Sequence, residues 1–201
     1  MFLNYISKCS LASQFLWTGG TALAYIYNHR LSTDLDFFTE QLLWDFEILP
    51  LIQDIKKNLH IDHIQQHISQ NRRIYLCDES YDHLKFEITF FPFTSHYSTQ
   101  KRNNTICIDS PIDIAINKVH AISEREEPKD VVDLYYILKN TNTTIETLII
   151  WVEQKFGVYL EYKTILARVL YIAEQLDSIT PFMIDQDYSS LLLKQFFISK
   201  L

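Results

Sequence analysis

The segment from Trp17 to Phe38 constrains this chain most, because it joins a glycine pair to two alternating carboxylates. Gly19 and Gly20 lie between a short apolar stretch and a helix-like stretch, and Asp34-Leu-Asp36 follows a polar turn. Side chains at i and i+2 of a strand point to the same face, so the two aspartates are expected side by side. Two such carboxylates repel each other unless a cation neutralises them. Mg²⁺ favours carboxylate oxygens together with substrate phosphates.

The glycine pair strengthens this prediction. The chain has only three glycines, and two of them are adjacent here. Glycine is favoured where φ is positive or where the backbone approaches a ligand closely. A helix N-terminus binds phosphate through its unpaired N–H groups and its dipole. The segment therefore predicts both halves of a metal–triphosphate site, and a purely structural turn is the alternative interpretation.

Composition limits the class of protein. The chain has 201 residues, of which 47% are hydrophobic and 21% charged, which suits one domain or two small ones. Its net charge of −7 does not favour nucleic-acid binding, although a local basic stripe remains compatible with RNA. Three cysteines without metal or redox spacing indicate reduced thiols. Neither a signal peptide nor an apolar span of about 20 residues is found. We therefore expect a cytoplasmic protein without a membrane partner.

The hydrophobic pattern changes near residue 110. Before it, helices are predicted over 2–12, 21–28 and 41–59, and strands over 14–18, 35–38, 61–69, 72–77, 83–93 and 105–108. After it, every periodic segment is helical: 112–123, 129–138, 144–156, 159–176 and 188–199. Ser110 and Pro111 suit the cap and first turn of the first of these helices. We predict an α+β fold with a mixed α/β domain over 1–110 and a helical domain over 111–201.

A third carboxylate lies on the strand predicted over 83–93. Glu87 and Lys85 alternate with apolar residues there, so they project from the face opposite the core. Near the aspartates, Glu87 would complete a two-metal or metal-plus-base arrangement; the alternative is a surface strand residue. Lys85 either contacts a phosphate or pairs with Glu87.

Further candidates lie in the helical half. Lys118 interrupts an apolar helix, so it either reaches triphosphate oxygens or extends its amine to solvent. Asp130 and Asp133 are three residues apart and share a helix face. A stabilising interaction with the helix dipole is the simpler role for Asp130. Three histidines straddle a predicted helix–strand junction and are interpreted as scattered surface residues: His60, His63 and His67.

Together these motifs resemble the nucleotidyltransferase superfamily, whose signature joins Gly-Gly or Gly-Ser to Asp-x-Asp. Within it, residues 15–138 are similar to the AbiEii/AbiGii toxin family of bacterial nucleotidyltransferase-like proteins. The segments that carry this resemblance are Gly19-Gly-Thr-Ala-Leu23, His29-Arg-Leu-Ser-Thr-Asp-Leu-Asp-Phe37, Lys118, Arg125, Pro128-Lys-Asp130 and Asp133-Leu134.

The resemblance implies a nucleotidyltransferase fold, with a mixed sheet flanked by helices, followed by an all-helical C-terminal domain. It implies transfer of a nucleoside monophosphate from an NTP, with release of pyrophosphate and dependence on Mg²⁺, for which Mn²⁺ can substitute. Some family members are toxins that add nucleotides to the 3′ end of tRNA and are partnered by an antitoxin, often a transcriptional regulator. We therefore expect a tRNA-modifying toxin of a toxin–antitoxin or phage-defence system.

The resemblance also assigns roles to residues. Asp34 and Asp36 become the catalytic metal ligands, and Glu87 resembles the third acidic position of the superfamily. Lys118 would contact the triphosphate, and Asp130 would organise the site or assist deprotonation. The residues expected to bind phosphate are Gly19, Gly20, Thr21, Arg30 and Lys85.

Three alternatives use the same residues. The chain could bind a nucleotide, RNA or a partner protein without turnover. It could transfer a nucleotide to a protein or to a cationic small molecule such as an aminoglycoside, which would suit its acidic composition. It could also be a structural or interaction protein whose glycine and aspartate segment is only a turn.

Overall fold

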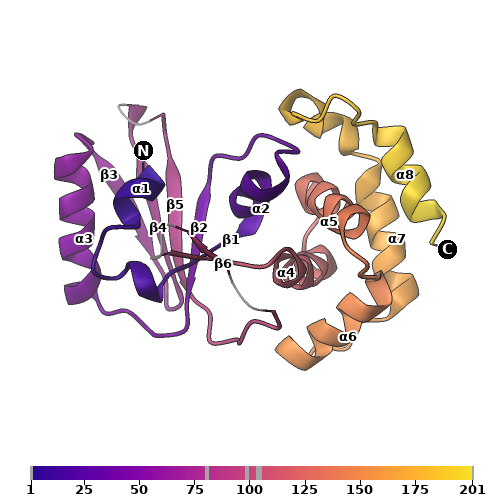
Figure 1. Cartoon of the computed structure of the whole chain (residues 1–201), viewed down its shortest axis with the longest axis horizontal. Helices are drawn as coiled ribbons and strands as arrows, with labels where there is room; N and C mark the ends of the chain where they lie inside the picture. The colour runs from indigo at the N-terminus through magenta and orange to yellow at the C-terminus, as the bar shows by residue number, and fades with distance from the viewer. Residues whose placement is uncertain (1, 80–81, 98–99, 103–105, 201) are drawn as a thin grey trace. The chain divides into compact units, whose positions relative to one another are not determined.

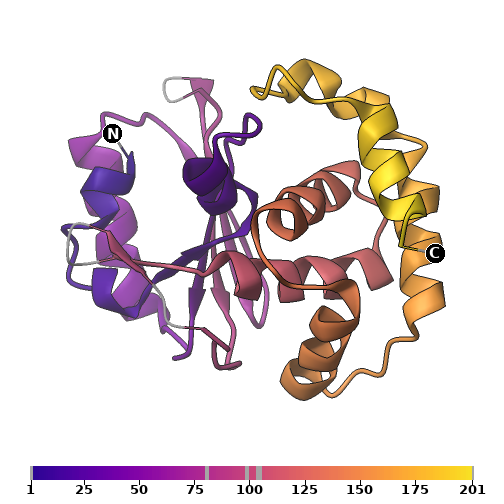
Figure 2. The same ribbon diagram turned by 45° about the vertical axis from the view of Figure 1, so that its right-hand side comes forward.

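The computed structural model describes residues 2–79, 82–97, 100–102 and 106–200, and for residues 100–102 it describes the backbone alone. The chain forms two compact units, which Figures 1 and 2 show in ribbon form. The first unit consists of Met1–Ala22, Thr33–Thr94 and Ser98–Asp109, and the second of Leu23–Ser32, Ser95–Tyr97 and Ser110–Leu201.

The first unit contains a mixed sheet, as predicted. Its seven strands within the described residues follow the order β3-β4-β5-β2-β1-β7-β6. The strands are β1 Leu16–Thr18, β2 Leu35–Thr39, β3 Ile64–Ile68, β4 Arg72–Cys77, β5 Lys85–Phe90, β6 Gln100–Arg102 and β7 Ile106–Ile108. The pairs β2–β5 and β1–β7 are parallel, and the other neighbouring pairs are antiparallel. The strands that carry the predicted carboxylates, β2 and β5, are therefore direct neighbours.

Helices α1 (Phe2–Ile6) and α3 (Asp45–Asn58) lie on the same side of this sheet (Figures 1 and 2). The ring of Phe2 packs on that of Phe86 in β5, with 4.9 Å between the centroids. The alternation predicted for β5 is confirmed, because Phe86 and Ile88 are buried in the core that these helices cover. Lys85 and Glu87 consequently project from the opposite face.

The second unit is helical, as predicted. Its main helices are α4 Pro111–Glu124, α5 Pro128–Asn140, α6 Ile145–Phe156, α7 Tyr162–Ala173 and α8 Ser190–Ile198. Helix α4 packs against α5, α6 and α7, and α8 packs against α7. The predicted cap of α4 is confirmed, because the Ser110 hydroxyl accepts a hydrogen bond from the backbone N–H of Asp113 at 3.0 Å.

Some element boundaries differ from the prediction. The helix predicted over 2–12 ends at Ile6, and a short 3₁₀ turn (Ala12–Gln14) precedes β1. A second 3₁₀ segment, Leu176–Phe182, follows α7 and was not predicted. Strand β6 was also missed, because its Gln-Lys-Arg sequence lacks apolar alternation and becomes a strand only by pairing with β7. Thr105, at the start of the last predicted strand, lies outside the described residues.

Candidate functional site

The glycine turn of the first unit is built around the carboxylate of Asp36. Strand β1 ends at Thr18, and α2 (Gly19–Tyr27) begins at the next residue. Gly19 has a φ of +76°, and a Cβ atom there would lie 2.5 Å from Asp36 Oδ2. Both the positive φ and the close approach require glycine at this position. The turn therefore brings the start of a helix against the second aspartate.

The two aspartates lie where the predicted strand places them. Asp36 is opposite Thr18 on β1 and opposite Glu87 on the parallel strand β5. The Thr21 hydroxyl in the first turn of α2 donates to the backbone carbonyl of Asp34. This bond ties the helix start to the approach to β2.

A lysine accompanies the first aspartate. Lys85 Nζ lies 3.4 Å from Asp34 Oδ2, and the Asp34 side chain is 42% exposed. Lys85 and Glu87 share a face of β5, and Glu87 is registered with Asp36. Both aspartates therefore project from this face. Lys85 pairs with Asp34. It does not pair with Glu87, which was one of the two predictions for this lysine.

Glu87 has an arginine partner that was not anticipated. Arg72 donates to both of its carboxylate oxygens, from Nε at 2.6 Å and from Nη2 at 2.8 Å, and the Thr89 hydroxyl donates at 2.7 Å. Burial opposes ionisation, but these hydrogen bonds outweigh it and lower the pKa of Glu87. The role of third metal ligand stays a prediction, and it would require the bridge to Arg72 to open.

The residues of this face suit a Mg²⁺ ion whose ligands come partly from the protein and partly from the substrate. No group of three histidine, cysteine, aspartate or glutamate side chains in the described residues is arranged to hold a metal by itself. Mg²⁺ is commonly held by one or two carboxylates plus substrate phosphates, and Mn²⁺ accepts the same oxygen ligands. Asp34 and Asp36, beside a helix N-terminus, match that donor set.

The second unit contains a buried cluster centred on Lys118. Its Nζ lies 2.6 Å from Asp130 Oδ1 and 2.8 Å from Asp133 Oδ2, and the residue is only 7% exposed. The prediction that Asp130 and Asp133 share a helix face is confirmed, and extension of the amine to solvent is excluded. Burial favours the neutral amine, but the two carboxylates outweigh it and raise the pKa of Lys118.

Asp133 is the most enclosed member of the cluster. It is fully buried and accepts from Arg30 Nε at 2.7 Å, Arg30 Nη2 at 2.8 Å and His29 Nε2 at 2.8 Å, besides Lys118. Burial alone would raise the pKa of this carboxyl, but Lys118, His29 and Arg30 together lower it. Arg30 thus has a buried carboxylate as its partner in this structure, and its predicted contact with phosphate stays a prediction.

Asp130 connects the cluster to the surface. It accepts from Lys118 and, at 2.8 Å, from both Nε and Nη2 of Arg125, whose side chain is 55% exposed. Burial opposes ionisation, yet the charge of Lys118 and the hydrogen bonds from Arg125 and Lys118 lower the pKa of Asp130. The contacts of its carboxylate are thus salt bridges to side chains, although the residue stands in the first turn of α5.

Sequence reasoning missed one further acid of the first unit. Asp109 follows β7, is buried, and accepts a hydrogen bond from the Thr18 hydroxyl at 2.7 Å. The signal in the sequence that could have identified Asp109 is its position between an apolar strand and the Ser-Pro cap of the next helix. The interpretation of the three histidines is confirmed, since His60, His63 and His67 are all exposed. The three cysteines, all within the described residues, form no disulfide.

The sheet unit thus combines a glycine turn packed on Asp36 with a second aspartate, Asp34, on the same face of the sheet. The family model described as nucleotidyl transferase AbiEii toxin, Type IV TA system, matches residues 2–197, and the chain belongs to this family. It is therefore a nucleotidyltransferase of the AbiEii toxin type.

Three individual proteins are similar to this chain in sequence or in fold. The uncharacterized protein aq_aa25 of Aquifex aeolicus (strain VF5) is 27% identical over 173 residues, which cover 86% of this chain and 80% of that protein. The crystal structure of a candidate nucleotidyltransferase from H. pylori superposes with a TM-score of 0.58 at 17% identity, covering 100% of this chain and 93% of the other. The Megavirus polyadenylate synthase gives a TM-score of 0.50 at 19% identity, covering 69% and 30%. At these identities the two structures support the fold alone.

None of the described helices combines the length and the apolar character that crossing a bilayer demands.

Proposed function

We propose that this protein transfers a nucleoside monophosphate from an NTP to the hydroxyl at the 3′ end of tRNA, with release of pyrophosphate. The observation that carries the proposal is the packing of the Asp36 carboxylate against Gly19, where α2 begins. Asp34 projects from the same face, so the helix N-terminus and both carboxylates act on one substrate.

Each part of this face has a role in the proposal. Asp34 and Asp36 would hold Mg²⁺ or Mn²⁺, and the start of α2 at Gly19, Gly20 and Thr21 would receive the phosphates. The ion, when bound, neutralises charge that develops on the transferred phosphoryl group. The protein then contributes mainly positioning and fixed charges for in-line attack by the acceptor hydroxyl.

For Lys118 and Asp130 we propose the roles of triphosphate contact and organising acid. The charge of their cluster supports an anionic ligand, because three side-chain cations face two carboxylates. The cations are Lys118, Arg30 and Arg125, and the carboxylates are Asp130 and Asp133. One positive charge is therefore left over in a largely buried environment, where an anion is bound most strongly.

The biological setting is part of the proposal. The family is that of a Type IV toxin–antitoxin system, which supports an antitoxin or regulator as partner and the control of growth or phage infection as role. Among acceptors, tRNA is proposed because it offers a 3′ hydroxyl at the end of a polyanion that a metal-loaded site attracts.

The test is transfer of label from each α-³²P NTP to total bacterial RNA in the presence of Mg²⁺. A labelled band of tRNA size is expected with the wild-type protein. Asp36→Asn should reduce the labelling by about 100-fold or more without unfolding the protein. Asp54→Asn, at an exposed position of α3, is the matched control and should retain the activity.

Other outcomes redirect the proposal. A labelled product that resists ribonuclease would replace tRNA by a protein or small-molecule acceptor. Absence of any product, with Mg²⁺-dependent NTP binding retained in calorimetry, would identify an inactive relative. A fully active Asp36→Asn variant would sink the assignment of the site.

A further inference from the structure

Arg72 is held rigidly on the face of the sheet that carries the aspartates. Its guanidinium makes a two-pronged contact with Glu87, with distances of 2.6 and 2.8 Å. The Arg72 side chain is 55% exposed, whereas that of Glu87 is only 9% exposed. A buried carboxylate thus orients the guanidinium of a side chain that is more than half exposed. A side chain oriented in this way loses little further conformational freedom when it binds an anion.

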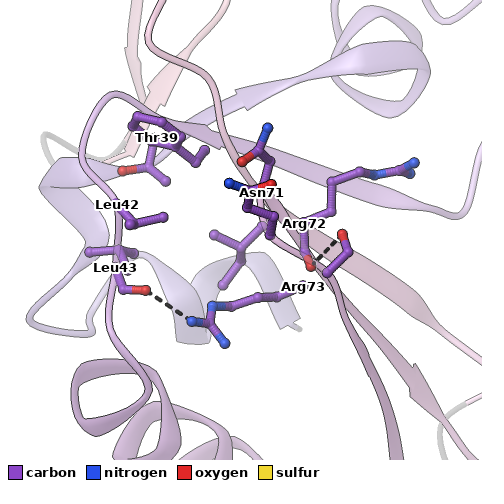
Figure 3. A pocket seen from close by; sticks show the side chains of 10 residues that line it. Thr39, Leu42, Leu43, Asn71, Arg72 and Arg73 are labelled. Atoms are coloured by element: carbon purple, nitrogen blue, oxygen red, sulfur yellow. Dashed lines mark hydrogen bonds between the residues drawn. The ribbon is translucent and has the colours of Figure 1, made fainter.

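The neighbouring arginine shows that this orientation is specific. Arg73 follows Arg72 on β4 and, by strand alternation, projects to the opposite face. There its guanidinium contacts Asp45 and donates to the backbone carbonyl of Leu43 at 3.0 Å. Figure 3 shows Arg73 reaching Leu43 beside a small pocket, while Arg72 points away from that pocket. Arg72 and Arg73 are therefore adjacent arginines with different surroundings, and Arg73 can serve as the control for Arg72.

The strand order separates Arg72 from the glycine turn. Along the sheet the sequence of strands is β4-β5-β2-β1, so Asp36 on β2 lies between Arg72 on β4 and Gly19 after β1. The proposed triphosphate position is at the start of α2, on the β1 side. The β4 side of the aspartates is consequently available to the second substrate, the acceptor.

The surface beyond Arg72 combines exposed polar residues of β3 with two half-buried apolar residues of β4, Ile74 and Leu76. The register of β3 with β4 puts His67 opposite Ile74 and Gln65 opposite Leu76, on the same face as Arg72, and both side chains are exposed. A small-molecule acceptor is normally enclosed in a concave and largely apolar pocket. The exposed polar side chains of β3, together with Arg72, suit an extended polyanion, whose phosphates are contacted mainly by arginine, lysine and polar groups.

A divalent ion neutralises the net charge of this face. Four carboxylates lie there with two side-chain cations, which leaves two net negative charges. The carboxylates are Asp34, Asp36, Glu87 and Asp109, and the cations are Lys85 and Arg72. A divalent ion cancels this charge, so the metal-loaded face no longer repels a phosphodiester although the whole chain carries −7.

We propose that Arg72, oriented by Glu87, contacts a backbone phosphate of a nucleic-acid acceptor that lies over β4 and β3. The inference rests on the proposed function, since it names the part of the protein that binds the acceptor. It also gives Glu87 a role as a positioning residue, which competes with its predicted role as a third metal ligand.

The experiment measures binding of a fluorescein-labelled RNA hairpin with a single-stranded 3′ tail by anisotropy. Mg²⁺ and an α,β-methylene NTP are present, and the salt concentration is varied from about 50 to 200 mM. Arg72→Ala should weaken RNA binding by about tenfold and reduce the salt slope by about 0.7 to 1. Arg73→Ala should change neither quantity. The affinity of Arg72→Ala for the Mg²⁺–nucleotide in calorimetry should stay within about twofold of wild type.

Glu87→Gln separates the two roles of Glu87, because it preserves volume and removes the charge. If Glu87 positions Arg72, this variant weakens RNA binding in the same direction as Arg72→Ala and leaves Mn²⁺ binding, measured by electron paramagnetic resonance, unchanged. Loss of Mn²⁺ binding with intact RNA binding would instead make Glu87 a metal ligand and overturn the inference. Arg72→Lys keeps the charge without the fork and should restore only part of the affinity.

Failure of this inference can be distinguished from failure of the proposed function. Unchanged RNA binding by Arg72→Ala overturns the inference alone. No RNA binding by the wild-type protein with nucleotide bound overturns the inference and also tRNA as the acceptor, and leaves nucleotide transfer to another acceptor standing. Weakened nucleotide binding by Arg72→Ala would place Arg72 at the triphosphate and also overturns it. Absence of Mg²⁺-dependent nucleotide binding by the wild-type protein overturns the proposed function.

Discussion

Asp34 in the sheet unit and Asp133 in the helical unit have opposite surroundings. In the sheet unit, Asp34 is 42% exposed and its lysine partner is 3.4 Å away. In the helical unit, Asp133 is completely buried and accepts from Lys118, Arg30 and His29 at 2.7 to 2.8 Å. An exposed pair contributes about 0–1 kcal/mol to stability, whereas breaking a buried pair costs about 3–5 kcal/mol.

This difference distinguishes a carboxylate that can bind a ligand from carboxylates that stabilise the fold. The exposed carboxylate of Asp34 keeps access to solvent and can exchange its lysine partner for a metal ion. The buried carboxylates of the helical unit are committed to their protein partners, because removing one partner leaves an uncompensated charge. Four predictions test this contrast, beginning with the largest expected effect.

Asp133→Asn should lower the free energy of unfolding by about 3–5 kcal/mol, because Lys118 and Arg30 lose the carboxylate that compensates them. The measurement is chemical denaturation followed by circular dichroism. Asp187→Asn, at an exposed position in the same unit, is the control and should change stability by less than about 0.5 kcal/mol. Equal stability of the two variants would contradict the assignment of a stabilising role to the buried cluster.

Gly19→Ala should cost more than Gly157→Ala, although both glycines have a positive φ, of +76° and +68°. The shared backbone penalty is about 1–2 kcal/mol. At Gly19 the added methyl group also collides with Asp36, and overpacking of this kind adds about 1–3 kcal/mol. At Gly157 nothing lies within 4 Å of the added atom.

The same pair of variants has a second readout, in metal binding. Gly19→Ala should also weaken Mn²⁺ binding, since it displaces a proposed ligand, whereas Gly157→Ala should leave it unchanged. Similar losses of stability and of Mn²⁺ affinity in both variants would rule out the close packing of Gly19 on Asp36.

Acid should reduce the contribution of the buried cluster to the free energy of unfolding. Asp130 and Asp133 have folded pKa values below the unfolded value of about 3.9, so their contribution is complete above about pH 4. Below that pH the unfolded chain takes up protons first, and stability falls by about 1.4 kcal/mol per pH unit and group. The stability difference between wild type and Asp133→Asn should therefore shrink from about pH 4 downwards. A constant difference down to pH 2 would contradict the lowered pKa of Asp133.

Lys85→Met should have the smallest effect on stability, below about 1 kcal/mol, because its pair with Asp34 is exposed. It should also strengthen Mn²⁺ binding in the absence of nucleotide by about fivefold. Lys85 competes with the ion for Asp34, so its removal makes the free energy of Mn²⁺ binding more favourable by about 1 kcal/mol. Titration followed by electron paramagnetic resonance measures the affinity. Weaker Mn²⁺ binding in this variant would show that Lys85 does not compete with the ion.

Local patterns were sufficient for much of the fold and for the centre of the candidate site. Backbone geometry over a few residues accounts for the alternation along β5, for the Ser110 cap of α4 and for the need for glycine at position 19. The same is true of Asp34 and Asp36, whose orientation depends only on their being two residues apart at a strand.

The partners of the charged residues could not be read in this way. Arg30 and Asp133 are separated by 103 positions, and Arg72 meets Glu87 across two strands. Whether Arg72 or Arg73 faces the aspartates depends on the register of β4, where a shift of one residue exchanges the two faces. The contact of Lys118 with Asp130 and Asp133 likewise required α4 and α5 to pack together.

The sequence by itself thus determined most of the elements and the spacing of the aspartate pair, because φ preferences, caps and periodicity act between neighbouring residues. The tertiary structure alone decided which carboxylates are committed to protein cations and which keep access to a ligand. The physical reason is that the strength of an ion pair depends on its burial and geometry, and both are set by segments that are distant in the chain.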